Sequence, residues 1–339
     1  MISKMKSQLN ANDYQNIIQS FKNLPPILTI GDVGIDQYTF GDVKRISPEA
    51  PVPILEVEKK WYKLGLAANV AENISSLSGQ CHLFGLIGDD YYGNLFESLL
   101  EEKKLTTWGL VRDKNRQTTV KERVVTSVQQ IVRIDYESSK NMLDDVKDRL
   151  INRLEEFIPK QGAIILEDYG KGIFGPETTQ SIIKLAIKSS KKVYIDPSRY
   201  SDPKWYMGAS LLKPNWAEAL ELSQKLGGQY TDPHDVNKFL SHELNIPQIV
   251  TTKGAEGIFY YAAENNLSKH LPTVKVEVFD VSGAGDTTIA MLTLAQLANA
   301  SLEQSCFLAN CASGVVVGKK GTASVTLEEL TDFYQSHYH

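Results

Sequence analysis

The chain has 339 residues, of which 42% are hydrophobic, 23% charged and 9% aromatic, and 36 Lys and Arg against 41 Asp and Glu give a net charge of −5. This composition is typical of a folded globular protein and excludes collagen-like, disordered and disulfide-scaffold classes. A mildly acidic chain without a basic stripe is a poor binder of nucleic acid or of an anionic membrane.

Targeting and disulfide signals are also missing from the sequence. No run of about 18 apolar residues predicts a transmembrane helix, and the N-terminal stretch MISKMKSQLN lacks the apolar segment of a secretory signal. The odd set of cysteines, Cys81, Cys306 and Cys311, contains no CxxC pair and argues against a disulfide framework. We therefore expect a cytoplasmic protein.

Short apolar runs alternate with amphipathic stretches along most of the chain. Apolar residues at helical spacing in 17–24 predict a short N-terminal helix, which Pro25 and Pro26 end. We expect residues 1–26 to form a helical extension and 27–339 to form one domain. The alternation predicts an α/β fold with a mainly parallel sheet covered by helices on both faces. Strands are expected at 27–32, 82–88, 163–168, 192–197, 210–215, 247–252 and 257–262, and helices near 67–78, 91–103, 143–157, 176–189, 215–225 and 234–243.

Two segments interrupt this alternation. Residues 37–64 contain the proline-spaced stretch RISPEAPVPILEVE, and residues 117–136 alternate polar and apolar side chains with period two. These are patterns of antiparallel strands. We expect both segments to form one small secondary sheet.

The most informative stretch runs from Asp280 to Asp286, DVSGAGD, and precedes the helix-forming run TTIAMLTLAQLANA. Gly283, Ala284 and Gly285 permit a tight turn whose backbone amides point into the N-terminus of the next helix, where phosphate is attracted. Asp286 would lie in the first helical turn, placed to accept a proton from a hydroxyl while the amides hold a phosphoryl group. The alternative is that Asp286 only caps the helix and that the glycines only form a turn.

Competing motifs fit the chain poorly. The phosphate-loop pattern GxxxxGK[ST] is absent, and GAGDTT lacks the third glycine of a dinucleotide fingerprint and lies far from a first βα unit. The six histidines make no metal-binding spacing.

Asp280–Asp286 resembles the C-terminal signature of the ribokinase-like (PfkB-type) sugar kinases. An N-terminal signature in LGLAANVAENISSLSGQCHLFGLIG is similar as well. The resemblance covers roughly residues 27–332 and implies a ribokinase-like three-layer sandwich with a small antiparallel β-lid, to which 37–64 and 117–136 would belong. The residues that fall at the family's N-terminal spacing are Gly65, Asn69, Ala71, Ser78 and Gly88.

Longer stretches are similar to one group in that family, the kinases of D-glycero-β-D-manno-heptose 7-phosphate, which make the 1,7-bisphosphate on the route to ADP-heptose. In many bacteria this kinase is fused to an adenylyltransferase domain, and the chain resembles the stand-alone form. The resemblance implies ATP and Mg²⁺ and leaves a requirement for a monovalent cation open. The stretches are GDVGIDQYTFGDVKRISPEAPVPILEVE, QQIVRIDYE, EDYGKG, LLKPNWAE and CFLANCASGVVVGKKGTASVT.

For the sugar, the resemblance implies that Asp36 binds hydroxyls through both carboxylate oxygens, and that Gly65 and Asn69 lie against the same substrate. Asp36 could instead cap the loop that follows it, and Asn69 could have a structural role. Lys121 and Arg123 share one face of a lid strand, because alternate residues of a strand point the same way. Two such cations suit a sugar phosphate, although they could be a solvated charge pair. Arg45 and Arg133 are further candidates for the phosphate.

For the nucleotide, Asn215 and Glu218 match an NxxE element that in this family helps hold Mg²⁺, largely through water. Mg²⁺ keeps several waters, so few direct protein ligands are expected. Lys171 would meet the nucleotide phosphates, unless it is a surface lysine after a turn. The remaining implied residues are Thr252, Gly254 and Gly257 near the ribose and phosphates, and Asn310 and Gly314 along the adenine pocket, where simple packing is the alternative.

The chain departs from the family pattern at three places. Leu66 stands where a second glycine is usual, and a leucine at positive φ would cost roughly 1–2 kcal/mol. Glu167 stands where Ser is commoner, and DPSR at 196–199 replaces the more usual DPKG.

We therefore expect an ATP-dependent heptose-phosphate kinase with Asp286 as its base. One alternative keeps the fold and changes the sugar, and another, motivated by Leu66, is a catalytically silent sugar-phosphate-binding protein. Because lid strands expose edges, we also expect a homodimer through the lid, and no nucleic-acid or membrane partner.

Overall fold

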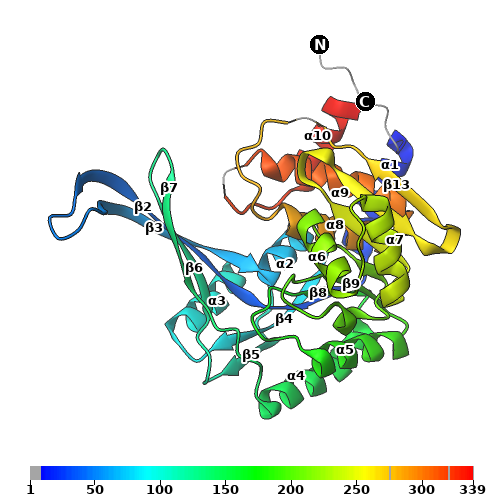
Figure 1. Ribbon diagram of the computed structural model, residues 1–339, viewed down its shortest axis with the longest axis horizontal. Helices are drawn as coiled ribbons and strands as arrows, with labels where there is room; N and C mark the ends of the chain where they lie inside the picture. The colour runs from blue at the N-terminus through cyan, green and yellow to red at the C-terminus, as the bar shows by residue number, and fades with distance from the viewer. Residues whose placement is uncertain (1–8, 275, 320, 339) are drawn as a thin grey trace.

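The fold, described for residues 9–274, 276–319 and 321–338 of a computed structural model, is built on a nine-stranded sheet (Figure 1). Its strand order is β13-β12-β11-β10-β9-β8-β1-β4-β5. All neighbours from β5 to β11 in that order are parallel, and β12 and β13 are added antiparallel. The strands are β1 (Ile27–Gly31), β4 (Cys81–Gly88), β5 (Leu110–Asp113), β8 (Ala163–Glu167), β9 (Lys192–Asp196), β10 (Leu211–Leu212), β11 (Gln248–Thr252), β12 (Ile258–Ala262) and β13 (Leu267–Leu271).

Each face of the sheet is covered by helices that bury a separate apolar core. Successive side chains of a strand point to opposite faces, so Ala163 and Ile165 enter one core while Ile164 and Leu166 enter the other. The first core is closed by α1 (Ala11–Ser20), α2 (Ala67–Ser76), α3 (Tyr91–Glu102), α8 (Ala284–Leu297), α9 (Leu302–Val317) and α10 (Leu327–Tyr338). The second is closed by α4 (Asp144–Phe157), α5 (Pro176–Lys188), α6 (Trp216–Lys225) and α7 (Pro233–Leu244).

The predicted α/β architecture with a mainly parallel sheet is confirmed. The N-terminal helix α1 begins at Ala11, earlier than its apolar residues indicated, because the side chain of Asn10 caps it by accepting from the amide of Asp13. Its Tyr14 ring stacks on Tyr334 of α10 at 4.1 Å between centroids. The division into an extension (1–26) and a domain (27–339) stays an interpretation.

A second, four-stranded sheet projects from the body as the lid (Figure 1). Its order is β3-β2-β6-β7, formed by β2 (Val33–Ile46), β3 (Pro53–Leu66), β6 (Thr119–Val125) and β7 (Gln130–Tyr136). The expectation of a wholly antiparallel lid is wrong at its centre, because β2 and β6 pair in parallel. Both strands leave the body and run outward, and period-two alternation is the same in either pairing mode.

The two faces of the lid differ in character. Asp36 pairs in register with Lys121 and Tyr38 pairs with Arg123, so these side chains share one face. The strand alternation puts exposed apolar side chains on the opposite face, and we call this set the outer lid face. It comprises Val43 (37% exposed), Val57 (53%), Val132 (45%) and Ile134 (40%).

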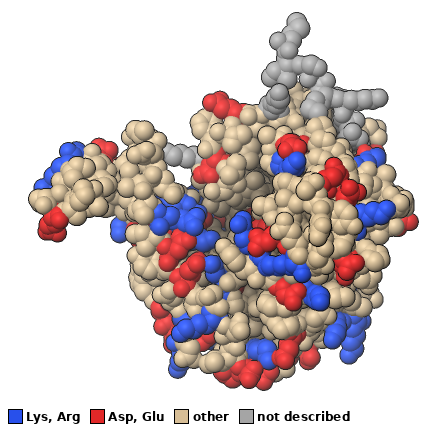
Figure 2. All heavy atoms as spheres, in the orientation of Figure 1, with Lys and Arg blue, Asp and Glu red and all other residues tan. Residues whose placement is uncertain are grey.

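Over the surface seen in Figure 2, basic and acidic side chains are interspersed. Among the described residues, no helix combines the length and the apolar character that a membrane span needs. All three cysteines are buried and free. The expected cytoplasmic location stays a prediction.

Candidate active site

Asp286 lies in the first turn of α8, where the sequence motif predicted it, and its side chain is buried. The turn before it depends on Gly283, which has φ 82°. A Cβ at Gly283 would also lie 2.9 Å from Nδ2 of Asn69. Both the backbone conformation and this close approach therefore require glycine.

The carboxylate of Asp286 does not cap its helix. Oδ2 accepts a hydrogen bond from Nδ2 of Asn69 at 2.5 Å, and Oδ1 accepts one from the hydroxyl of Tyr169 at 2.8 Å. Within the described residues, the hydrogen bonds of this carboxylate go to Asn69 and Tyr169 and not to a backbone amide of α8. The interpretation of Asp286 as a capping residue is therefore wrong, and its carboxylate is held by two other elements.

Burial raises the pKa of Asp286 above its ordinary range, while the hydrogen bonds from Asn69 and Tyr169 and the charge of Lys213 lower it. Burial and the neighbouring Asp286 also raise the pKa of Tyr169 well above the usual value for tyrosine. Tyr169 is therefore a neutral hydroxyl that donates, and Asp286 is a buried acceptor suited to take up a proton.

On the lid side, Asp36 is held by two donors. Nη1 of Arg123 lies 2.6 Å from its Oδ1, and the hydroxyl of Thr322 donates to its Oδ2 at 2.9 Å. Asp36 therefore lies within a strand and does not cap a loop. Gly65 packs directly on it, because a Cβ there would lie 3.3 Å from the carboxylate carbon of Asp36.

Lys121 lies on the same lid face as Asp36 and approaches Tyr169, the partner of Asp286. Its ammonium lies 5.4 Å from the centroid of the Tyr169 ring, and the Tyr169 hydroxyl reaches Asp286. Burial lowers the pKa of Lys121 below its usual value. The structure thus brings Lys121, Arg123 and Asp36 to one side of Asp286. Their binding of a sugar phosphate stays a prediction.

Three other predicted cations lie in different surroundings. Arg133 makes a two-point ion pair with Asp135, at 2.8 and 3.0 Å. Arg45 lies on the outer part of β2, roughly 30 Å along the strand from Asp36 at about 3.3 Å per residue. Lys171 makes an ion pair of 2.7 Å with Glu137. We therefore expect the first two to contribute little to the site, and Lys171 to need release from Glu137 before it could meet a phosphate.

A cavity of about 490 Å³ lies against the first turns of α8, where Ala284, Gly285 and Thr288 form part of its wall. Its walls are largely apolar, with Val274, Val276, Val278 and Val281 among them, which suits a flat aromatic ring. The predicted nucleotide residues that line it are Thr252, Gly254, Gly257, Asn310 and Gly314, together with Ala284 and Gly285 of the predicted anion turn.

Asn215 and Glu218, the predicted metal-binding pair, form a reciprocal capping box at the start of α6. Oδ1 of Asn215 accepts from the amide of Glu218 at 3.0 Å, and Oε2 of Glu218 accepts from the amide of Asn215 at 2.8 Å. This structural role accounts for the NxxE spacing without a ligand. One carboxylate oxygen of Glu218 stays outside the capping box.

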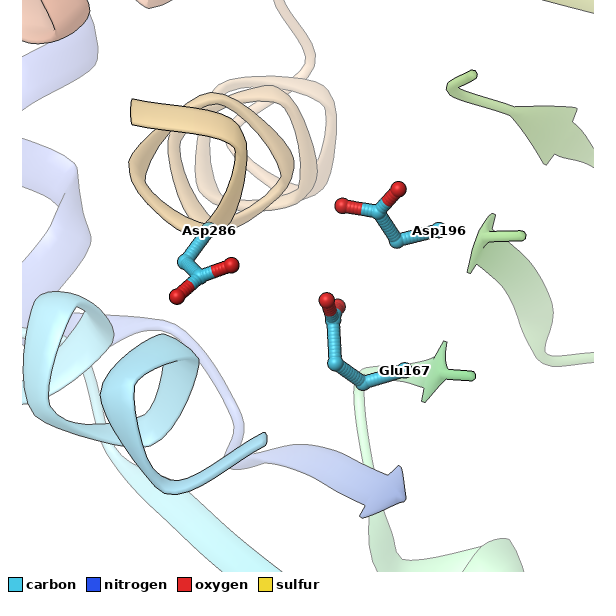
Figure 3. A group of neighbouring side chains, drawn as sticks. All are labelled: Glu167, Asp196 and Asp286. Carbon is cyan, nitrogen blue, oxygen red and sulfur yellow. The ribbon is translucent and has the colours of Figure 1, made fainter. Parts of the chain in front are cut away.

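Sequence reasoning missed a buried cluster at the carboxyl ends of β8, β9 and β10. Glu167, Asp196 and Asp286 each place one carboxylate oxygen within 4.8 Å of the others (Figure 3). Nζ of the buried Lys213 binds Oδ2 of Asp196 at 2.8 Å. Burial raises the pKa of Glu167 well above its ordinary range, and that of Asp196 to about 7. The signal was available, because parallel strands place their carboxyl ends at one edge, where ligands bind.

A buried carboxylate at a helix N-terminus, set between an apolar cavity and a charged lid, is an arrangement suited to phosphoryl transfer. A profile described as pfkB family carbohydrate kinase matches residues 28–329. The chain belongs to this family. The expectation of a sugar kinase with a ribokinase-like fold is thereby confirmed.

Curated bacterial proteins are similar to the chain along most of its length. The bifunctional protein HldE of Helicobacter pylori strain J99 is 41% identical over 304 residues, which are 90% of this chain and 65% of that protein. HldE of Nitratiruptor sp. is 38% identical over 315 residues, 92% of this chain and again 65% of the relative. The chain therefore spans slightly less than two thirds of the length of these relatives.

Solved structures support the fold. Ribokinase of Thermotoga maritima superposes with a TM-score of 0.72 at 21% identity, covering 92% of this chain and 99% of that one. Phosphofructokinase-2 of Escherichia coli, solved in complex with potassium, gives 0.75 at 20% identity over the same shares. At this identity the likeness concerns the fold alone.

Phosphoryl transfer by such a kinase implies Mg²⁺, a hard cation that takes oxygen ligands. The residues at the strand ends fit it. Oε2 of Glu167 is buried and has no hydrogen-bond partner within the described part of the chain. Asp196 offers a carboxylate beside it, whereas each member of the Asn215 and Glu218 pair already uses one oxygen for capping.

Proposed function

We propose that the kinase transfers a phosphoryl group from ATP to the anomeric C1 hydroxyl of D-glycero-β-D-manno-heptose 7-phosphate, giving the 1,7-bisphosphate and ADP as a step toward ADP-heptose. The observation that carries the proposal is the buried Asp286, held by Asn69 and Tyr169 between the lid and the apolar cavity. The choice of sugar is supported by 41% identity to a bifunctional HldE protein and by the stretch RISPEAPVP, which occupies the β2–β3 hairpin of the lid.

In this mechanism Asp286 takes the proton of the C1 hydroxyl as the C1 oxygen forms its bond to the γ-phosphorus and the bond to ADP breaks. The first amides of α8 have no intrahelical partner, so those of Gly283, Gly285 and Asp286 can donate to the phosphoryl oxygens during transfer. The amide of Ala284 already donates to the carbonyl of Val281 at 3.3 Å. Bound Mg²⁺ would supply charge neutralisation on the phosphates. The apolar walls of the cavity hold the adenine and exclude water.

The lid orients the sugar in this proposal. Asp36 accepts from sugar hydroxyls with Arg123 and Thr322 fixing its orientation, and Lys121 and Arg123 supply positive charge for the 7-phosphate. Movement of the lid onto the body would complete the site. We also propose that two copies of the chain associate through the outer lid face, whose apolar side chains are exposed to water.

A coupled assay of ADP release tests the substrate. D-glycero-D-manno-heptose 7-phosphate should support turnover, and fructose 6-phosphate and mannose analogues extended to seven carbons should support much less. Faster turnover with another sugar phosphate would favour a kinase of different specificity. Sugar binding without ADP release from any of them would favour a silent binding protein.

A further inference from the structure

The carboxylates at the ends of β8 and β9 carry more charge than their surroundings balance. Glu167, Asp196 and Asp286 lie within 4.8 Å of one another, and the ammonium that the structure places against them is that of Lys213, bound to Asp196. When fully ionised, three carboxylates and one ammonium have a formal charge of −2. Buried charge of this size is costly unless a cation balances it.

The three carboxylates of this cluster are not equivalent as candidate metal ligands. Both oxygens of Asp286 already accept hydrogen bonds, from Asn69 and Tyr169. Glu167 is 2% exposed, and its Oε2 is buried with no hydrogen-bond partner in the described structure. Figure 3 shows the Glu167 side chain pointing into the space between Asp286 and Asp196. The side chain that carries this unpartnered oxygen is therefore aimed at the centre of the cluster.

We propose that Glu167 and Asp196 form a binding site for a divalent cation in this chain, filled without nucleotide or sugar, with Asp286 beside the ion and not bound to it. The spacing allows this. Two oxygens that bind one Mg²⁺ lie about 3 to 4 Å apart, and slightly farther for a larger ion. Lys213 holds one oxygen of Asp196 at 2.8 Å and leaves the other available.

Glu167 is the residue that gives the site its affinity. A neutral side chain such as serine at this position would contribute no charge to the cluster. With Glu167 in place the net charge of the cluster matches a divalent ion. The ion would stand at the edge of the sheet next to the start of α8, because a Cβ on Gly285 would lie 3.5 Å from Nζ of Lys213 and 3.8 Å from Oδ2 of Asp196.

Mn²⁺ is the probe, because it takes oxygen ligands as Mg²⁺ does and is followed by electron paramagnetic resonance. The full chain, free of nucleotide and sugar, is titrated with Mn²⁺ by resonance and by calorimetry. We expect one ion per chain, and at least tenfold weaker binding in both Glu167→Gln and Glu167→Ser. Mn²⁺ should also raise the melting temperature of the unmodified chain and leave that of both variants unchanged.

Glu218→Gln is the matched control, since Gln at the same position keeps the capping box. Its Mn²⁺ affinity should fall less than that of either Glu167 variant, because the charge of Glu218 acts on Asp196 and Lys213 only from beside the cluster. Absence of binding by the unmodified chain at millimolar Mn²⁺ would overturn the proposal. Unchanged binding by either folded Glu167 variant, or loss of binding in Glu218→Gln alone, would overturn it too. Failure here would leave the heptose-phosphate assay unaffected, because neither substrate is present.

Discussion

The side-chain amide of Asn69 donates a hydrogen bond of 2.5 Å to Oδ2 of Asp286, which joins the first turn of α2 to the first turn of α8. A second hydrogen bond joins the same two helices: the hydroxyl of Thr287 in α8 donates to Oδ1 of Asn73 in α2 at 2.9 Å. The N-termini of two helices therefore converge on the carboxylate, and each carries partial positive charge. This arrangement favours negative charge on Asp286 and a phosphoryl group beside it.

Asp286→Asn should lower kcat by a factor on the order of 10²–10⁴, because an amide cannot accept the proton of the sugar hydroxyl. Stability should change by less than about 2 kcal/mol, since the amide of Asn69 can turn to present its oxygen to the new amide while one buried charge is removed. Nucleotide affinity should be unchanged or improved. Steady-state kinetics, nucleotide Kd and melting temperature on one preparation measure all three.

The control for this variant is Asp232→Asn, which changes an aspartate that does cap a helix, α7, far along the chain from the site. Because Asn is an equally good cap, both its kcat and its melting temperature should be near normal. If Asp286→Asn kept more than about a tenth of the kcat, Asp286 would not be the base.

Tyr169→Phe should reduce kcat about tenfold and leave the KM values of nucleotide and sugar nearly unchanged. Tyr169 positions Asp286 through a hydrogen bond of 2.8 Å, and a bond to a charged group contributes about 1.5–3 kcal/mol. Tyr194→Phe is the matched control, because its hydroxyl bonds Gln296 at 3.2 Å near the other end of α8. A loss of kcat shared by both variants would contradict the positioning role.

The fold could be predicted from the sequence because long apolar runs and amphipathic stretches determine it. Short or polar elements at the edges of the sheet could not be predicted. β5 is only Leu110–Asp113, and β13 reads LSKHL, so neither has a strong pattern. The parallel pairing of β2 with β6 was missed because alternation does not distinguish the two modes.

The positions of candidate site residues could be predicted where a family motif contains them, as at Asp286 and in the glycines of the cavity. Contacts between the ends of strands that are distant in sequence could not be predicted. The ion pair of Lys213 with Asp196 and the hydrogen bond of Tyr169 to Asp286 depend on which strands become neighbours. The leucine at position 66, where a glycine is usual, predicted a strained backbone from the sequence alone. Leu66 indeed has φ 58°, a conformation that glycine would adopt without strain.

Leu66→Gly should be more stable than Leu66→Ala by about 1 kcal/mol, the reverse of the usual order. Glycine normally costs about 0.5–1 kcal/mol relative to alanine, but a residue with a Cβ at positive φ costs roughly 1–2 kcal/mol. Both variants lose the buried leucine side chain, so their difference isolates the backbone strain. Urea denaturation of the pair measures it.

The same pair of substitutions at Leu64 provides the comparison, because Leu64 is buried on the same strand and is not among the residues with positive φ. There the alanine variant should be the more stable one. If alanine were also preferred at position 66, the strain assigned to Leu66 would be absent.

The outer lid face should hold two copies of the chain together. Val57 and Ile134 expose 53% and 40% of their surface on the side of the lid that faces away from Asp36 and Arg123. Light scattering at micromolar concentration should give twice the 37.8 kDa of one chain.

The double variant Val57→Glu with Ile134→Glu should give the mass of a single chain, because burying two carboxylates against their symmetry mates is costly. Lys59→Glu, a charge change on the opposite lid face, should stay dimeric. A monomeric mass for the unmodified chain, or an unchanged dimer in the double variant, would exclude association through this face.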